Sequence, residues 1–221
     1  MPEDIDLTVL EKKVYQRYFE DGIWDLFLGM IIFSLGFAPL FSLFINIPDP
    51  WNYIFPALGV NILALLIFFF GKKYITVPRI GFVKFGPKRK AKQKKLRLFL
   101  FIVFIINIIL IILPITGISS HIQIEQYILS LLIGFGAFTL PFCVVAYFLD
   151  FTRLYYYAFS IGLGFFLTEL LASTFGGPFN MSLIFCGIGG IILIIGLIYF
   201  IRFLKQNPLP KDIPKQEVAD G

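Results

Sequence analysis

Histidine and cysteine are scarce in this chain, with one histidine and two cysteines among 221 residues. A protein zinc site takes three or four ligands at short spacings, and His121, Cys143 and Cys186 do not form such a motif. The sequence also lacks a nucleophile elbow and a phosphate-binding glycine loop. We therefore expect no metal and no cofactor, and we identify no catalytic residue.

Charged residues are also few. They make up 15% of the chain, whereas hydrophobic residues make up 58%. This composition is too apolar for the surface of a water-soluble globule. Eleven of the 19 lysines and arginines fall within residues 72–97, between long uncharged apolar runs. The sequence therefore predicts an integral membrane protein.

Six apolar stretches are long enough to cross a hydrocarbon core of about 30 Å, at a rise of about 1.5 Å per helical residue. The expected spans are residues 24–47, 51–71, 98–116, 127–149, 154–175 and 181–200. Lipid cannot satisfy open backbone groups, and the stretches lack the alternation typical of barrel strands. We therefore predict an all-α integral membrane fold with six transmembrane helices.

All lysines and arginines fall on one side of this arrangement: three before the first span, eleven in the second connection, one in the fourth and four at the end. Basic loops stay in the cytoplasm, so we expect a plasma membrane protein with both termini cytoplasmic. Residues 1–23 should be a cytoplasmic amphipathic segment with a short interfacial helix. Residues 24–204 should be the transmembrane domain, with a basic cytoplasmic loop at 72–97, and 205–221 a disordered cytoplasmic tail.

An internal repeat is one explanation for a similarity between the first and last helix pairs. With a constant offset of 128 positions, three pairs of turn and small residues align: Pro50 with Pro178, Asn52 with Asn180, and Gly59 with Gly187. These matches fall at a hairpin turn and at expected close-packing positions, which favours a parallel repeat of helices 1–2 and 5–6. Chance similarity between apolar sequences is the alternative.

Small residues four positions apart predict further helix contacts, because this spacing puts them on one face. The pairs are Ser130 with Gly134, Ala158 with Gly162, Ser160 with Gly164, and Cys186 with Gly190. We expect them to pack helices within one subunit rather than to form a dimer interface.

The basic connection has two parts. Residues 74–85, YITVPRIGFVKF, read as two short β-prone arms around a turn. Residues 86–95, GPKRKAKQKK, are polybasic and could dock on anionic lipid head groups, set the topology only, or bind a protein or nucleic acid partner. The candidate head-group or phosphate-binding residues are Arg79, Lys84, Lys88, Arg89 and Lys90.

The segment YITVPRIGFVKF resembles a short motif in the cytoplasmic loop of small, uncharacterised prokaryotic multi-pass membrane proteins. The matching residues are Pro78, Arg79 and Gly81. The resemblance implies that these three residues act together, and it implies no particular activity or substrate.

Glu169 is the only acidic residue deep inside an expected span, about 9 Å from its outer end. An intramembrane carboxyl is a candidate for proton or solute handling. The alternative is a hydrogen-bonded glutamate that helps helices associate.

Asp21, Asp25 and Asp150 should gather at the inner membrane edge. Helix capping and pairing with the basic loop would explain them. The alternative is that they serve a membrane-embedded lipid head-group enzyme, with Arg79 and the polybasic run as phosphate binders.

The leading functional hypothesis is a non-enzymatic multi-pass membrane protein that moves a small solute or lipid, or assists a membrane complex. Besides the head-group enzyme, a structural or regulatory subunit is the remaining alternative. We expect membrane lipids with anionic head groups as partners, with a homo-oligomer or larger membrane complex as a further option, and no nucleic acid.

Overall fold

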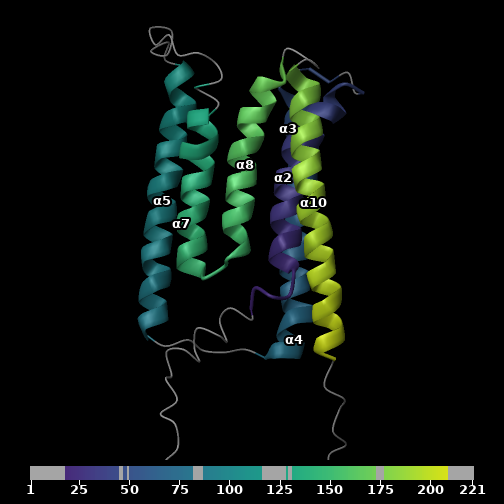
Figure 1. Ribbon diagram of the computed structural model, residues 1–221, viewed down its shortest axis with the longest axis vertical. Helices are drawn as coiled ribbons and strands as arrows, with labels where there is room; N and C mark the ends of the chain where they lie inside the picture. Colours follow the sequence, from purple (N-terminus) through teal and green to yellow (C-terminus); the bar gives the residue numbers. More distant parts are fainter. Residues whose placement is uncertain are drawn as a thin grey trace, which may run out of the picture.

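The computed structural model describes residues 18–44, 47–48, 50–81, 87–115, 128, 131–172 and 177–208. Every regular element within these ranges is helical, and none is a strand. Figure 1 shows the helices side by side along the long axis of the molecule, with α8 between the α5–α7 pair and the group formed by α2, α3 and α10. The predicted all-α fold is confirmed.

The helices follow the apolar runs of the sequence. Their bounds are α2 Ile23–Ser42, α3 Trp51–Phe70, η1 Gly71–Thr76, α4 Val77–Ile80, α5 Pro87–Ile115, η3 Ile133–Thr139, α7 Leu140–Leu149, α8 Arg153–Leu170 and α10 Gly177–Gln206. Three helical stretches are long and apolar enough to cross a membrane: Ile23–Ser42, Trp51–Ile80 and Phe179–Gln206. The other three expected spans overlap with α5, with η3 and α7, and with α8. Their crossing of the membrane stays a prediction.

The first of the two expected β-prone arms, at 74–77, is wrong because these residues are helical, and the second, at 82–85, lies outside the described residues. The second membrane-length helix continues without a break through η1 and α4 to Ile80, and the polybasic run belongs to α5, which begins at Pro87. Gly81 ends the first of these helices with φ of 82°, a conformation that favours glycine, and its N–H donates to the Val77 carbonyl. Lysine, arginine, glutamine and alanine are good helix formers, so the polybasic sequence extends a helix rather than a loop.

The chain forms two π-helical stretches, η1 and η3, and both end at the threonine of a Thr-x-Pro sequence, at 76–78 and at 139–141. In each, the residue before the proline donates its N–H five positions back: Val77 to the Lys72 carbonyl and Leu140 to the Phe135 carbonyl. Proline has no N–H and its ring crowds the carbonyl four residues earlier. The regular ladder is therefore interrupted, and the preceding turn widens.

Helices α2 and α10 are antiparallel and lie in backbone contact. A Cβ atom added at Gly36 would lie 2.6 Å from the Cys186 backbone nitrogen, and one added at Gly189 would lie 2.5 Å from that of Phe33. Toward the other end, a Cβ at Gly196 would lie 2.8 Å from the Leu26 nitrogen. Such close approach is the usual role of small residues between membrane helices. It fixes α10 against the start of α2.

The hydrophobic core lies where α2, α7, α8 and α10 meet. Its most deeply buried members include Ile32, Ala146, Ile161 and Phe185, and it continues to one end of the bundle through Phe19, whose ring stacks on that of Phe151 at a centroid distance of 5.3 Å. This packing holds the short segment before α2 against the connection between α7 and α8.

The expected close-packing role of Gly59 and Gly187 is wrong. A Cβ atom added at either position would meet no described atom within 4 Å, so both positions are open. The parallel repeat itself stays a prediction. In contrast, the expected contact at Gly134 and Gly162 is confirmed, because a Cβ at Gly134 would lie 2.7 Å from the Gly162 carbonyl oxygen.

Candidate functional site

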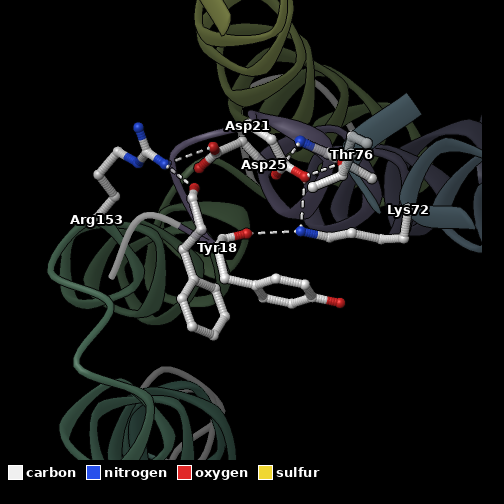
Figure 2. A network of polar contacts seen from close by, with 8 residues as sticks. Tyr18, Asp21, Asp25, Lys72, Thr76 and Arg153 are labelled. Atoms are coloured by element: carbon white, nitrogen blue, oxygen red, sulfur yellow. Dashed lines mark hydrogen bonds and ion pairs between the residues drawn. The ribbon is translucent and has the colours of Figure 1, made fainter. Parts of the chain in front are cut away.

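Asp21 and Asp25 lie at the start of α2 and are both 0% exposed. Gly22, between them, has φ of 73°, and a side chain there would collide with the Gly196 carbonyl of α10. Only glycine suits both conditions, so the chain can turn into α2 while pressed against its neighbour. This turn places two carboxylates inside the protein (Figure 2).

The Asp21 carboxylate is bound by donors from η1. The Lys72 ammonium lies 2.7 Å from Asp21 Oδ2, and the Thr76 hydroxyl donates to the same oxygen at 2.5 Å. The Ile23 backbone N–H donates to Oδ1. Lys72 also donates to the Tyr18 carbonyl and lies 3.8 Å from the centroid of the Tyr18 ring. The buried charge of Asp21 is therefore neutralised and hydrogen-bonded, as burial of a charge requires.

The Asp25 carboxylate is bound in the same way by α8. The Arg153 guanidinium lies 3.0 Å from Asp25 Oδ2, and the Tyr157 hydroxyl donates to Oδ1 at 2.7 Å. Arg153 also donates to the Phe19 carbonyl at 2.6 Å, and its guanidinium lies 3.8 Å from the centroid of the Tyr199 ring. Its buried Nε–H has no acceptor among the described residues.

The two pairs share one pattern. Each carboxylate receives a cation and a hydroxyl that lie four positions apart on another helix: Lys72 with Thr76, and Arg153 with Tyr157. Residues four apart lie on one helical face, so each pair reaches the same carboxylate. We call Asp21, Asp25 and these four partners the charge network. It joins α2 to the helix that contains η1 and to α8.

Asp150, the third predicted inner-edge carboxylate, is paired outside the charge network. Its Oδ2 lies 3.2 Å from the Lys92 ammonium of α5, and the side chains are 16% and 28% exposed, respectively. The expected pairing with residues 72–97 therefore holds for Asp150 and for Asp21, whose partner is Lys72. Asp25 departs from it, because its partner is Arg153.

A cavity of about 480 Å³ lies beside the charge network, in the part of the chain that the structure describes. Arg153 lines it and is thus shared with the network. The other charged residues that line it are Glu20, Asp150 and Arg202, and its aromatic residues include Phe151, Tyr199 and Phe203. Polar and aromatic groups of both charges thus surround one hollow.

The predicted residues of the basic segment do not join this site. Arg79 is half-buried and folds back along its own helix, where it donates to the Ile75 carbonyl at 3.1 Å. Lys90 is exposed on α5. Lys84 and the side chains of Lys88 and Arg89 lie outside the described residues.

Glu169 is the penultimate residue of α8, which ends at Leu170 rather than at residue 175 as expected. It is half-buried, and its side chain makes no hydrogen bond or ion pair with the described residues. Its position inside a membrane span stays a prediction, and the buried carboxylates Asp21 and Asp25 are near the other end of α8. His121 falls outside the described residues.

Comparison with models of known protein families, with curated proteins and with solved structures found no match to this chain. Within the described ranges, no three histidine, cysteine, aspartate or glutamate side chains group together as metal ligands would. The functional interpretation therefore depends on the charge network and the neighbouring cavity.

Proposed function

We propose that this chain is a non-enzymatic, six-span plasma membrane protein that moves a lipid or a small solute, with both termini cytoplasmic. Three membrane-length helices support a membrane location. The ion pairs and the cavity lie at one end of the bundle. The basic residues there are Lys72, Lys92 and Arg153, which pair with carboxylates, and Arg202, which lines the cavity. This one-sided distribution supports a cytoplasmic assignment for that end.

The main support for this proposal is the charge network. Lys72 follows Trp51 by 21 positions, about 32 Å along the helix, so it lies near the edge of a hydrocarbon core of about 30 Å. Charges at this depth are costly, and in membrane proteins they commonly mark solute pathways and gates. Replacing a buried ion pair by apolar residues is often stabilising, so stability alone does not account for two such pairs.

The network is placed to act as a latch at the inner face. Asp21 ties the start of α2 to the helix containing η1, and Asp25 ties it to α8. Breaking either pair releases one helix from α2 without touching the outer half of the bundle. In this proposal, the described conformation is closed toward the cytoplasm, and opening separates the inner ends of these helices.

The head-group enzyme is less compatible with this geometry. Such an enzyme needs carboxylates that reach a head group, whereas Asp21 and Asp25 are fully buried and already bound to cations. Arg79, its proposed phosphate binder, is folded onto its own helix.

A buried reporter tests the latch. Ser34, on α2, is 1% exposed and faces Asn61 of α3. In a background in which Cys143 and Cys186 are replaced by alanine, Ser34→Cys should react slowly with a water-soluble maleimide. Adding Asp21→Asn should raise the rate at least tenfold, because it breaks the pair that ties α2 to the helix that bears Asn61. The matched control Lys92→Met breaks the more exposed pair and should leave the rate unchanged.

A flux measurement tests the activity. Liposomes that contain the protein should exchange a fluorescent phospholipid between leaflets, or release a trapped small solute, faster with Asp25→Asn than with Lys92→Met. Lower melting temperatures for Asp21→Asn and Asp25→Asn, with no change in maleimide rate for the first or in either flux for the second, would show that the network only stabilises the fold. The alternative of a structural subunit would then be preferred.

We also propose that the start of α5 docks on anionic lipid. Lys90, Lys94, Lys95 and Arg97 are exposed on this helix, and each basic residue near an anionic leaflet contributes about 1 kcal/mol. A peptide of residues 74–97 should bind anionic vesicles and dissociate as salt is raised. Equal binding to neutral vesicles would contradict the electrostatic mechanism.

A further inference from the structure

We propose that the 480 Å³ cavity binds the head group of an inner-leaflet phospholipid that carries both a phosphate and a primary amine. The inference deepens the proposed function, on which it rests, by naming the lipid class.

The first argument is the charge of the lining. Arg153 and Arg202 are opposed by Glu20 and Asp150 around one hollow. Arg202 and Glu20 are exposed, and their side chains make no hydrogen bond or ion pair with the described residues. A ligand with a negative and a positive group can satisfy both, whereas a purely anionic ligand would leave Glu20 unpaired beside a like charge.

The second argument is the Nε–H of Arg153. This buried donor has no acceptor among the described residues, although the same guanidinium binds Asp25 and the Phe19 carbonyl. Stacking on the Tyr199 ring holds the guanidinium in one plane. Arginine recognises phosphate through its parallel N–H groups, and the Arg153 side chain is 20% exposed. A phosphate that displaces one of the contacts around Arg153 would gain the unused Nε–H as a donor.

The third argument favours a lipid over a soluble molecule. A second hollow of about 430 Å³ shares Arg202 and Gln206 with the cavity. Its apolar walls are Ile198 and Ile201 of α10, which are 60% and 45% exposed on a face that a bilayer would cover. The two hollows together provide a polar site for a head group and an adjoining apolar groove for the start of an acyl chain. The cavity volume lies within the range of about 300–1,000 Å³ usual for small-ligand sites.

Binding would compete with the charge network for one side chain. Because Arg153 serves both Asp25 and the cavity, a phosphate at its Nε–H would share the guanidinium with the Asp25 carboxylate. The bound lipid could thereby weaken the tie between α2 and α8.

The experiment measures lipid binding to the full-length protein in detergent micelles, by native mass spectrometry and by the shift in melting temperature. The probes are phosphatidylethanolamine, phosphatidylcholine, phosphatidylglycerol and soluble phosphoethanolamine. Phosphatidylethanolamine should bind most tightly. Arg202→Gln and Glu20→Gln should each weaken its binding about tenfold or more, because each removes a charge-assisted contact. Lys205→Gln, which alters the second hollow alone, should change it little.

Three results would overturn the proposal. Equal binding of phosphatidylcholine would exclude recognition of the amine, and tighter binding of phosphatidylglycerol would exclude a zwitterionic site. Equal affinity for soluble phosphoethanolamine would exclude a lipid source. Because Arg202 and Glu20 are exposed, their variants should fold normally. Maleimide labelling of Ser34→Cys in the same micelles tests the latch separately, so either proposal can fail alone.

Discussion

Replacing Arg153 by methionine should destabilise the protein far more than the same replacement at Lys92. Arg153→Met keeps an unbranched side chain of similar length but leaves Asp25, which is 0% exposed, without its cation. Breaking a buried pair from one side costs about 3–5 kcal/mol. The Tyr157 hydroxyl still donates to Asp25, which favours the lower part of that range.

Lys92→Met is the matched control. It removes the cation from Asp150, but this pair is partly exposed, and such pairs contribute about 0–1 kcal/mol. The difference between the two variants should therefore be at least about 2 kcal/mol, or about 30-fold in the ratio of folded to unfolded protein. Equilibrium unfolding in mixed detergent micelles measures this difference directly.

A second substitution separates charge from packing. Asp25→Asn added to Arg153→Met removes the unpaired charge and keeps an acceptor for Tyr157, so the double variant should regain much of the lost stability. Equal stability of Arg153→Met and Lys92→Met, or a double variant no more stable than Arg153→Met alone, would refute the reasoning.

Three other predictions follow from packing, hydrogen bonding and charge. Gly36→Leu should separate α2 from α10 and lower the melting temperature sharply, whereas Gly59→Leu, at an open position, should leave it nearly unchanged. Thr76→Val should lower the free energy of unfolding by about 1–3 kcal/mol, because Asp21 loses a buried donor, and chemical denaturation should show it. Single cysteines at Lys92 and Ser120 should label from opposite sides of the membrane; labelling of both by an impermeant reagent outside intact cells would contradict the topology.

The helices were predictable because a long apolar run in lipid can satisfy its backbone hydrogen bonds only by forming a helix. Their ends were harder to predict. Lys72 and Lys73 mark the end of an apolar run, yet the helix continues to Ile80. Lysine is itself a good helix former, and the buried charge of Lys72 is neutralised by Asp21, 51 positions earlier in the chain. Such a pairing leaves no trace in local composition, so the charge network could not be found from the sequence, although both carboxylates could be named.

The contact between α2 and α10 did leave a sequence signal. Gly22, Gly29 and Gly36 recur every seven positions, and so do Ser182, Gly189 and Gly196 on the opposing helix. Two turns of helix take about seven residues, so each set forms one narrow stripe of small side chains. A search at intervals of four finds the contact of Gly134 with Gly162 but misses these longer stripes.

The two Thr-x-Pro sequences show how local chemistry and the site are connected. Proline and glycine close together indicate a turn in sequence, and residues 78–81 therefore suggested a turn between two short arms. Inside a membrane-length helix, the proline instead shifts the backbone hydrogen bonds from four to five positions back. Lipid offers the backbone groups no other hydrogen-bond partners, so the helix continues. Both threonines at these positions then bind outside their own helix: Thr76 to Asp21, and Thr139 to the Ala158 carbonyl of α8. Each π-helical stretch therefore ends at a threonine whose hydroxyl binds another part of the chain, and the first of these hydrogen bonds belongs to the charge network.

If the network opens as we propose, η1 is the element whose backbone can change its hydrogen-bond register. Its N–H groups already bind carbonyls five positions back, next to a proline that donates no hydrogen bond.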